Sequence, residues 1–212
     1  MHILFQGDSI TDAKRSREDL SNMGTGYAHL VKAYLNNREP GKYTFTNRGV
    51  GGNRVVDMYA RIKADLINLR PDFLSILIGV NDVWHELGHK NGVDAVKFEK
   101  IYTMLLEEVK EALPDTRILI MEPFVLAGPK TTGELEDGTD KYTVFRREVE
   151  LRAAASRRVA DRFHAEFLPL QQMFDDALKL APAEFWLLDG VHPTEAGHQK
   201  IANAWLGAFE RK

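Results

Sequence analysis

Short, almost continuous apolar runs alternate along this chain with longer amphipathic segments, and this alternation constrains its fold most strongly. The runs at Ile3–Gln6, Phe73–Ile78 and Arg117–Glu122 contain few polar positions. Such runs are typical of parallel strands that helices cover on both faces. Tyr43–Asn47 is more polar, which favours an edge strand, and Glu166–Leu168 is a short fifth candidate.

The segments between these runs carry apolar residues at the three- and four-residue spacing of amphipathic helices. The predicted helices are Tyr27–Leu35, Val55–Leu69, Phe98–Val109, Tyr142–His164, Gln171–Leu180 and Glu195–Phe209. Strand and helix alternate throughout, which predicts an α/β protein: a three-layer α/β/α sandwich around a central, mostly parallel sheet. A length of 212 residues suits one domain, 1–212, with a single large core.

Composition excludes several classes of function. The net charge is -3, which speaks against nucleic acid or an anionic membrane as a partner. Without cysteine the chain has no disulfides, no thiolate nucleophile and no cysteine-based zinc site. Met1 and His2 lead directly into the first predicted strand, with no secretory signal and no membrane-length apolar run. We therefore expect a cytoplasmic protein that needs no metal or other cofactor.

A serine stands at the end of the first predicted strand, in the sequence Gly7-Asp8-Ser9-Ile10. Ligands of open α/β sheets bind just outside the carboxyl ends of the strands, so Ser9 is a candidate nucleophile. A single serine in a turn is usually only a turn residue. The interpretation therefore requires a base, an acid that orients the base, and donors for an oxyanion.

The segment Asp189–Thr194, Asp-Gly-Val-His-Pro-Thr, leads into the last predicted helix. A carboxylate three residues before His192 is close enough to accept the Nδ1 proton, which leaves Nε2 free to face a nucleophile. Taken alone, Asp189 and His192 are better interpreted as turn and capping residues. Thr194 is a suitable helix N-cap in either case.

Two further segments offer hydrogen-bond donors. Glycines 49, 51 and 52 follow the second strand and precede a helix, where backbone N–H groups favour an anion. A plain glycine-rich connection is the alternative, and the phosphate-loop pattern is absent. After the third strand, Asn81 offers a side-chain donor or forms an Asx turn. There Asp82 caps a turn, and Trp84 forms a pocket wall or part of the core.

Other polar segments have simpler interpretations. Pro123–Asp140 is the longest irregular stretch and forms either a wall of the site or a surface loop. His85 and His89 are assigned to a surface turn because of the neighbouring glycine and polar residues. His198 is taken as a surface or packing residue. The arginines between positions 146 and 162 alternate with acidic residues and are assigned to a solvated helix face.

Four of these segments together resemble the GDSL, or SGNH, hydrolase family. The matching blocks are Gly7-Asp8-Ser9-Ile10, the Gly49–Asn53 loop, Gly79-Val80-Asn81-Asp82 and Asp189-Gly190-Val191-His192-Pro193. They occur in family order from residue 7 to residue 193. The resemblance implies a flavodoxin-like SGNH hydrolase fold and a serine esterase that works through an acyl-enzyme.

The resemblance also implies a role for each matching residue. Ser9 is the nucleophile, His192 the general base and acid, and Asp189 its partner. The implied oxyanion hole consists of the Ser9 N–H, a glycine N–H and the Asn81 side chain. Gly52 aligns best with the family glycine, and Gly51 is the alternative.

A narrower resemblance points to bacterial carbohydrate acetylesterases, especially intracellular acetylxylan esterases. It rests on four segments: 7–12, 25–27, 78–84 and 121–124. It implies an acetylated saccharide such as a xylo-oligosaccharide as the small-molecule ester substrate. Asp8, Trp84 and Trp186 are the implied substrate contacts, with a plain core tryptophan as the alternative for Trp186, and a homo-oligomer is expected.

Several other functions stay open on the sequence alone. Within the same fold, the alternatives are a thioesterase, a short-chain lipase and a phospholipid acetylhydrolase. A metal-dependent phosphoesterase using Asp8, Asp189, His192 and His198 belongs to another class, although no metal-binding motif supports it. A non-catalytic carbohydrate-binding protein is the remaining alternative.

Overall fold

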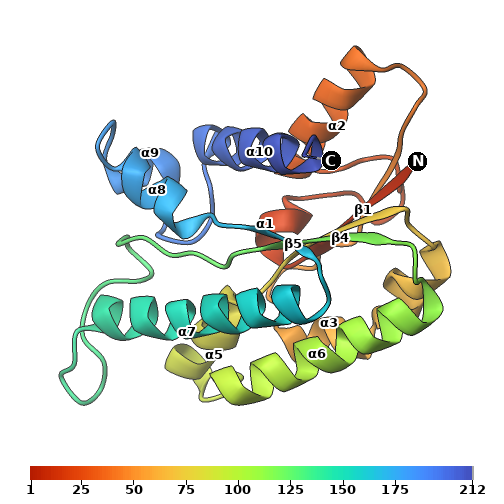
Figure 1. The fold of residues 1–212 in the computed structure, drawn as a ribbon. Coiled ribbons are helices and arrows are strands. Elements are labelled where there is room, and N and C mark those ends of the chain that lie inside the picture. Colours follow the sequence, from red (N-terminus) through yellow and green to blue (C-terminus); the bar gives the residue numbers. More distant parts are fainter. Residues whose placement is uncertain (212) are drawn as a thin grey trace.

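Five strands form one fully parallel sheet in the computed structural model, which describes residues 1–211 (Figure 1). The order is β2-β1-β3-β4-β5, so the polar strand β2 lies at an edge, as predicted. Each predicted strand is present, and no end differs from its predicted position by more than one residue. The strands are β1 (His2–Gly7), β2 (Thr44–Asn47), β3 (Phe73–Leu77), β4 (Arg117–Met121) and β5 (Glu166–Leu168).

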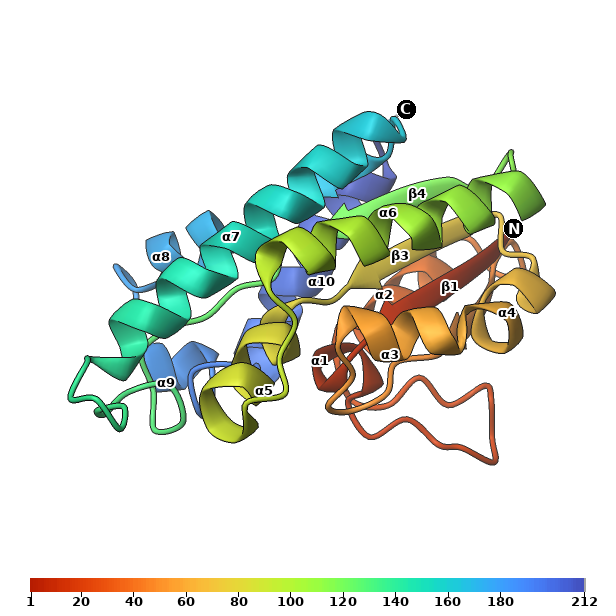
Figure 2. The same ribbon diagram turned by 90° about the horizontal axis from the view of Figure 1, so that it is seen from below.

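Helices cover both faces of this sheet, which confirms the three-layer α/β/α architecture (Figures 1 and 2). One face carries α2, α8 and α10, and the other carries α3, α6 and α7. The α-helices are α1 (Ser9–Asp12), α2 (Tyr27–Arg38), α3 (Val55–Ala60), α4 (Ile62–Asp65), α5 (Val80–His89), α6 (Ala95–Ala112), α7 (Lys141–Arg162), α8 (Gln171–Ala177), α9 (Ala183–Trp186) and α10 (Glu195–Phe209).

Alternate residues of each strand supply the two cores. In β1, Ile3 and Phe5 belong to the apolar cluster under α2 and α10, whereas Leu4 belongs to the cluster under α3 and α6. The indole N–H of Trp205, on α10, donates to Ser75 Oγ at 2.9 Å in the centre of the sheet. A sheet buried on both faces in this way projects its strand ends, and the loops that follow them, into solvent.

Two predicted segments differ from the structure. The helix predicted at Val55–Leu69 is broken into α3, α4 and a 3₁₀ turn at Ile67–Leu69. The first break is at Arg61, whose side chain donates to Asn53 Oδ1 and Gln6 Oε1. The turns predicted between Asn81 and His89 are wrong, because these residues form α5. Val80 and Val83 of this helix are buried, and Trp84 and Leu87 pack against the same core.

The arginine-rich helix also differs from its prediction at one position. Arg152 of α7 is 3 % exposed, whereas a solvated face was expected. Its guanidinium donates to the carbonyl of Val93 at 2.6 Å and pairs with Glu148. A buried guanidinium is tolerated here because backbone and carboxylate oxygens replace its water contacts. Within residues 1–211 no helix has the length and apolar character needed to cross a membrane.

Candidate active site

The site begins where β1 ends. Gly7 has φ +156°, and a Cβ atom there would stand 2.3 Å from the carbonyl oxygen of Leu77. Only glycine fits this contact between neighbouring strands. The chain then turns into α1, whose first residue is Ser9 and whose N-cap is Asp8. Ser9 is thereby presented at the carboxyl end of the sheet, as the sequence predicts.

The loop before α10 brings a histidine and a carboxylate to this serine. Ser9 Oγ lies 2.9 Å from His192 Nε2, and His192 Nδ1 lies 2.8 Å from Asp189 Oδ2. The other carboxylate oxygen of Asp189 accepts the backbone N–H groups of Val191 and His192 at 3.0 and 2.9 Å. These backbone bonds fix the carboxylate, which in turn fixes the orientation of the imidazole.

The same contacts set the charge state of the pair. Partial burial by itself raises the pKa of Asp189, but hydrogen bonds from the imidazole and the backbone outweigh it and lower that pKa to about 2. The hydrogen bond to Asp189 raises the pKa of His192 above its ordinary value. The carboxylate therefore stays ionised and stabilises an imidazolium whenever His192 takes up a proton.

Three potential donors come from the ends of neighbouring strands. Asn81 lies in the first turn of α5, and its Nδ2 donates to the carbonyl of Asn53 at 3.2 Å, which leaves its second N–H free. The backbone N–H groups of Ser9 and Gly52 have no acceptor within the described chain. Gly51 N–H instead donates to Asp12 Oδ2 at 3.1 Å. Of the two glycines, Gly52 has the available donor.

A cavity of about 600 Å³ opens beside Ser9 and His192. Apolar side chains and charged side chains both line it. The lining comprises Ser9, Ile10, Asp12, Ala13, Lys14, Arg15, Arg17, Thr25, Leu188, His192, Pro193, Thr194, Glu195 and His198. A small ester with a polar alcohol part fits the size and the mixed character of this space.

The three expected substrate contacts are placed differently from one another. Trp84 lies against the site, with its ring centre 5.7 Å from that of His192. Trp186 is only 8 % exposed, and its N–H donates to the carbonyls of Ala177 and Ala181 at 3.1 Å. Its geometry is that of a core residue and offers no substrate contact.

Asp8 also lies away from solvent, at 1 % exposed, so it is not placed to contact a substrate. One carboxylate oxygen accepts the N–H of Ile10 at 3.0 Å, and the other has no partner within residues 1–211. Burial is the largest cause of the rise of the Asp8 pKa to about 7. Asp82 is buried as well, and its carboxylate accepts the N–H of Val55 at the start of α3. Burial also raises the pKa of Asp82.

The first part of the Pro123–Asp140 stretch supports the site from behind. Leu126 N–H donates to the carbonyl of Gly190 at 2.9 Å, and Lys130 N–H donates to that of Asp189 at 3.0 Å. Thr131 is fully buried and donates its hydroxyl to Leu126 at 2.7 Å. These residues hold the Asp189 loop in place but do not line the cavity.

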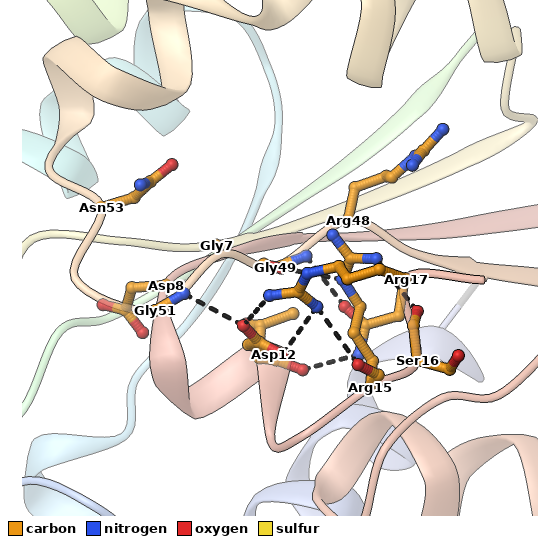
Figure 3. Close-up of polar contacts among 12 residues, drawn as sticks. Gly7, Asp8, Asp12, Arg15, Ser16, Arg17, Arg48, Gly49, Gly51 and Asn53 are labelled. Carbon is orange, nitrogen blue, oxygen red and sulfur yellow. Dashed lines mark hydrogen bonds and ion pairs between the residues drawn. The ribbon is translucent and has the colours of Figure 1, made fainter. Parts of the chain in front are cut away.

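One polar cluster beside the nucleophile was not anticipated from the sequence. Asp12, Arg15 and Arg17 follow Ser9; Asp12 and Arg15 contact the glycine loop after β2, and Arg17 binds Asp12 (Figure 3). The only local signal was an acidic residue three positions after Ser9, where one helical turn returns to the same side. The loop partner of Arg15, the carbonyl of Gly49, is 34 positions away in sequence, so spacing alone does not reveal it.

His198 also lines the cavity, and its Nδ1 accepts the N–H of Tyr27 at 3.2 Å. Burial is the main cause of the fall of its pKa to about 4, so this imidazole is neutral at physiological pH. Within residues 1–211, no three histidine, cysteine or carboxylate side chains gather as metal ligands do.

Comparison with known proteins gives a consistent result. The family model described as the GDSL-like lipase/acylhydrolase family matches residues 5–200. An acetylxylan esterase from Geobacillus stearothermophilus is 32 % identical over 96 % of this chain and 91 % of its own length. A solved structure of the acetylxylan esterase Axe2 from that organism superposes with a TM-score of 0.85 at 30 % identity, covering 100 % of this chain and 94 % of Axe2. A GDSL-like lipase candidate from Parabacteroides merdae gives 0.89 at 37 % identity, covering 100 % and 96 %.

Proposed function

The chain belongs to the GDSL-like lipase/acylhydrolase family and is a carboxylic ester hydrolase, and on that premise we propose that Ser9, His192 and Asp189 are its catalytic triad. The observation that carries the proposal is the continuous chain of contacts from Ser9 Oγ through the imidazole to Asp189, at 2.9 and 2.8 Å. Nucleophile, base and orienting acid need this arrangement.

The proposed reaction has two steps. Ser9 Oγ attacks the ester carbonyl carbon while His192 Nε2 accepts the hydroxyl proton. The tetrahedral oxyanion is stabilised by the Ser9 and Gly52 N–H groups and the Asn81 side chain. His192 then gives its proton to the departing alcohol, which leaves Ser9 acylated. Water attacks the acyl-enzyme through the same base, and the acid and free Ser9 are released.

We propose a short acyl group, acetyl, on a carbohydrate such as a xylo-oligosaccharide as the substrate. Similarity to the acetylxylan esterase supports this choice, as does the mixed polar and apolar lining of the cavity. Trp84, beside His192, is the proposed aromatic wall for the substrate. The proposed catalytic unit is the single domain 1–212.

A substrate panel and one variant test these proposals. The panel compares acetylated xylo-oligosaccharides, nitrophenyl esters of increasing acyl chain length, an acetylated phospholipid and acyl-CoA. A preference for acetyl esters of saccharides is expected. A preference for long chains, the phospholipid or thioesters would overturn the substrate proposal and identify a lipase, a phospholipid acetylhydrolase or a thioesterase.

The variant Ser9→Ala tests the triad separately from the substrate. It is expected to lose at least about 10³-fold in kcat while its unfolding temperature stays unchanged, because the triad members act as a unit. Labelling of Ser9 by a serine-directed phosphonate in the native protein is the matching positive result. Normal folding with near-native activity in Ser9→Ala would refute the assignment, and absence of any acyl-enzyme would indicate a binding protein.

A further inference from the structure

The segment after Ser9, residues 12–17, contacts the glycine loop after β2, which supplies the proposed glycine N–H donor (Figure 3). Asp12 Oδ2 accepts the N–H of Gly51 at 3.1 Å. Three residues after Asp12, the Nε of Arg15 donates to the carbonyl of Gly49, two residues before Gly51, at 2.8 Å. The Asp12 carboxylate therefore binds an N–H group of the loop, and the Arg15 guanidinium binds one of its carbonyl groups.

The glycine loop and the end of α1 are also closely packed. A Cβ atom on Gly49 would stand 2.3 Å from the backbone nitrogen of Asp12, so the loop backbone lies directly on the end of α1. Arg15 is only 7 % exposed. Ala13 and Lys14, between Asp12 and Arg15, both adopt left-handed backbone conformations, with φ of 41° and 62°. Such conformations cost energy in residues other than glycine, and here they lie directly before Arg15, whose side chain reaches the loop.

Arg17 completes the arrangement from the solvent side. Its guanidinium donates from Nη1 to Asp12 Oδ1 at 3.0 Å and from Nη2 to Asp12 Oδ2. Burial by itself raises the pKa of Asp12, but the hydrogen bonds from Arg17 and Gly51 outweigh it and the pKa is lowered. The carboxylate therefore stays ionised, which strengthens its bond to the Gly51 N–H.

We propose that Asp12 is a positioning residue for the oxyanion hole: by binding the Gly51 N–H it aims the next N–H group, that of Gly52, at the reacting carbonyl. Arg17 acts through Asp12 by holding its carboxylate. This inference rests on the proposed function, because it needs Gly52 as the oxyanion donor. It assigns no contact between Asp12 and the substrate.

The geometry predicts an order of effects. Asp12→Ala removes the acceptor and frees the loop, so kcat is expected to fall about 10- to 100-fold, less than the loss of a whole donor. Asp12→Asn keeps an oxygen for Gly51 and is expected to recover most of that loss. Arg17→Ala leaves the Asp12–Gly51 bond in place and is expected to cost less than 10-fold. KM is expected to change by no more than about twofold in each, because the loop acts on the transition state.

The experiment measures kcat and KM for a nitrophenyl acetate. The concentration of active sites is the amount of protein that a serine-directed phosphonate labels when the labelling is complete, and kcat is calculated from that concentration. This normalisation removes the effect of misfolded protein. The rate of labelling is expected to fall in parallel with kcat, because the phosphonate oxygen needs the same donors. Glu99→Gln, which weakens the Glu99–Arg158 pair between α6 and α7, is the control and is expected to keep native kinetics.

The outcomes separate this inference from the proposed function. If Ser9→Ala stays active, the triad assignment fails. If Ser9→Ala is inactive but Asp12→Ala keeps native kcat per labelled site, or changes KM alone, Asp12 has no positioning role. Failure of Asp12→Asn to recover activity would also overturn the inference.

Discussion

The backbones of Gly128 and Gly190 lie in direct contact, since a Cβ atom on Gly128 would stand 2.5 Å from the amide nitrogen of Gly190. Gly128 belongs to the loop after β4, and Gly190 directly follows the carboxylate that holds His192. Any side chain at position 128 therefore displaces the segment that orients the base. This contact links the first prediction to the site.

Gly128→Ala is expected to destabilise the protein by roughly 2 kcal/mol, because backbone must move to accommodate the new methyl group. That corresponds to a fall of about 4–8 °C in the unfolding temperature of a chain of this size. Activity falls with it as Asp189 shifts. Gly207→Ala is the matched control: nothing lies within 4 Å of the added Cβ in α10, so it is expected to stabilise the helix by about 0.5–1 kcal/mol.

Asn81→Ala tests the side-chain oxyanion donor. The variant is expected to lose on the order of 10²–10³ in kcat with little change in KM, because the donor acts mainly on the charge of the transition state. Steady-state kinetics with an acetyl ester measure the split. Asn203→Ala, on the exposed side of α10, is the control and is expected to keep native kinetics. A loss confined to KM would assign Asn81 to ground-state binding instead.

Asp189→Asn tests the cause of the raised His192 pKa. The reaction needs a neutral imidazole, and because Asp189 raises the pKa of His192, the acidic limb of kcat/KM is expected above pH 6.5, near which an unperturbed histidine titrates. In Asp189→Asn this limb is expected to move to lower pH, with a plateau roughly 10³–10⁴-fold lower. An unmoved limb would show that another group sets the pH dependence.

Asp8→Asn tests the buried carboxyl beside the nucleophile. Since burial raises the pKa of Asp8 to about 7 from about 4 in the unfolded chain, the folded state holds this proton more tightly. The native protein is therefore expected to lose stability as pH rises from about 4 to about 7, and to change no further through this group above that range. The variant lacks the titration, so its unfolding temperature relative to the native protein is expected to rise over this window. A pH-independent difference would contradict the assignment.

The three central strands, β1, β3 and β4, were predictable because each is an almost continuous apolar run, as burial on both faces requires. The positions of Ser9 and Asn81 followed from the same reasoning, because each comes directly after such a run. Helix α5 was missed because Gly88 and the polar residues around His85 and His89 were interpreted as a turn. Its apolar residues Val80, Val83, Trp84 and Leu87 have helical spacing and pack in or against the core, so the pattern that indicates this helix was present in the sequence.

The spacing of residues in the sequence did not predict the hydrogen-bond partners of several buried side chains. Arg15 binds the carbonyl of Gly49, and Arg152 binds that of Val93. Backbone oxygens are present at every position, so the sequence carries no mark of these acceptors. The burial of Trp186 could not be predicted for the same reason, because its N–H donates to backbone carbonyls at the end of α8 and beyond.

The contact between Ser9 and His192 joins residues 183 positions apart. No local segment contains both groups, so the proposed mechanism requires the first strand and the last helix to be docked on the same sheet. On the same mechanism, the emerging chain is expected to be inactive until His192 has left the ribosome. In refolding, the return of activity is therefore expected to report the final assembly of the whole sheet. The circular dichroism signal of the secondary structure is expected to recover earlier.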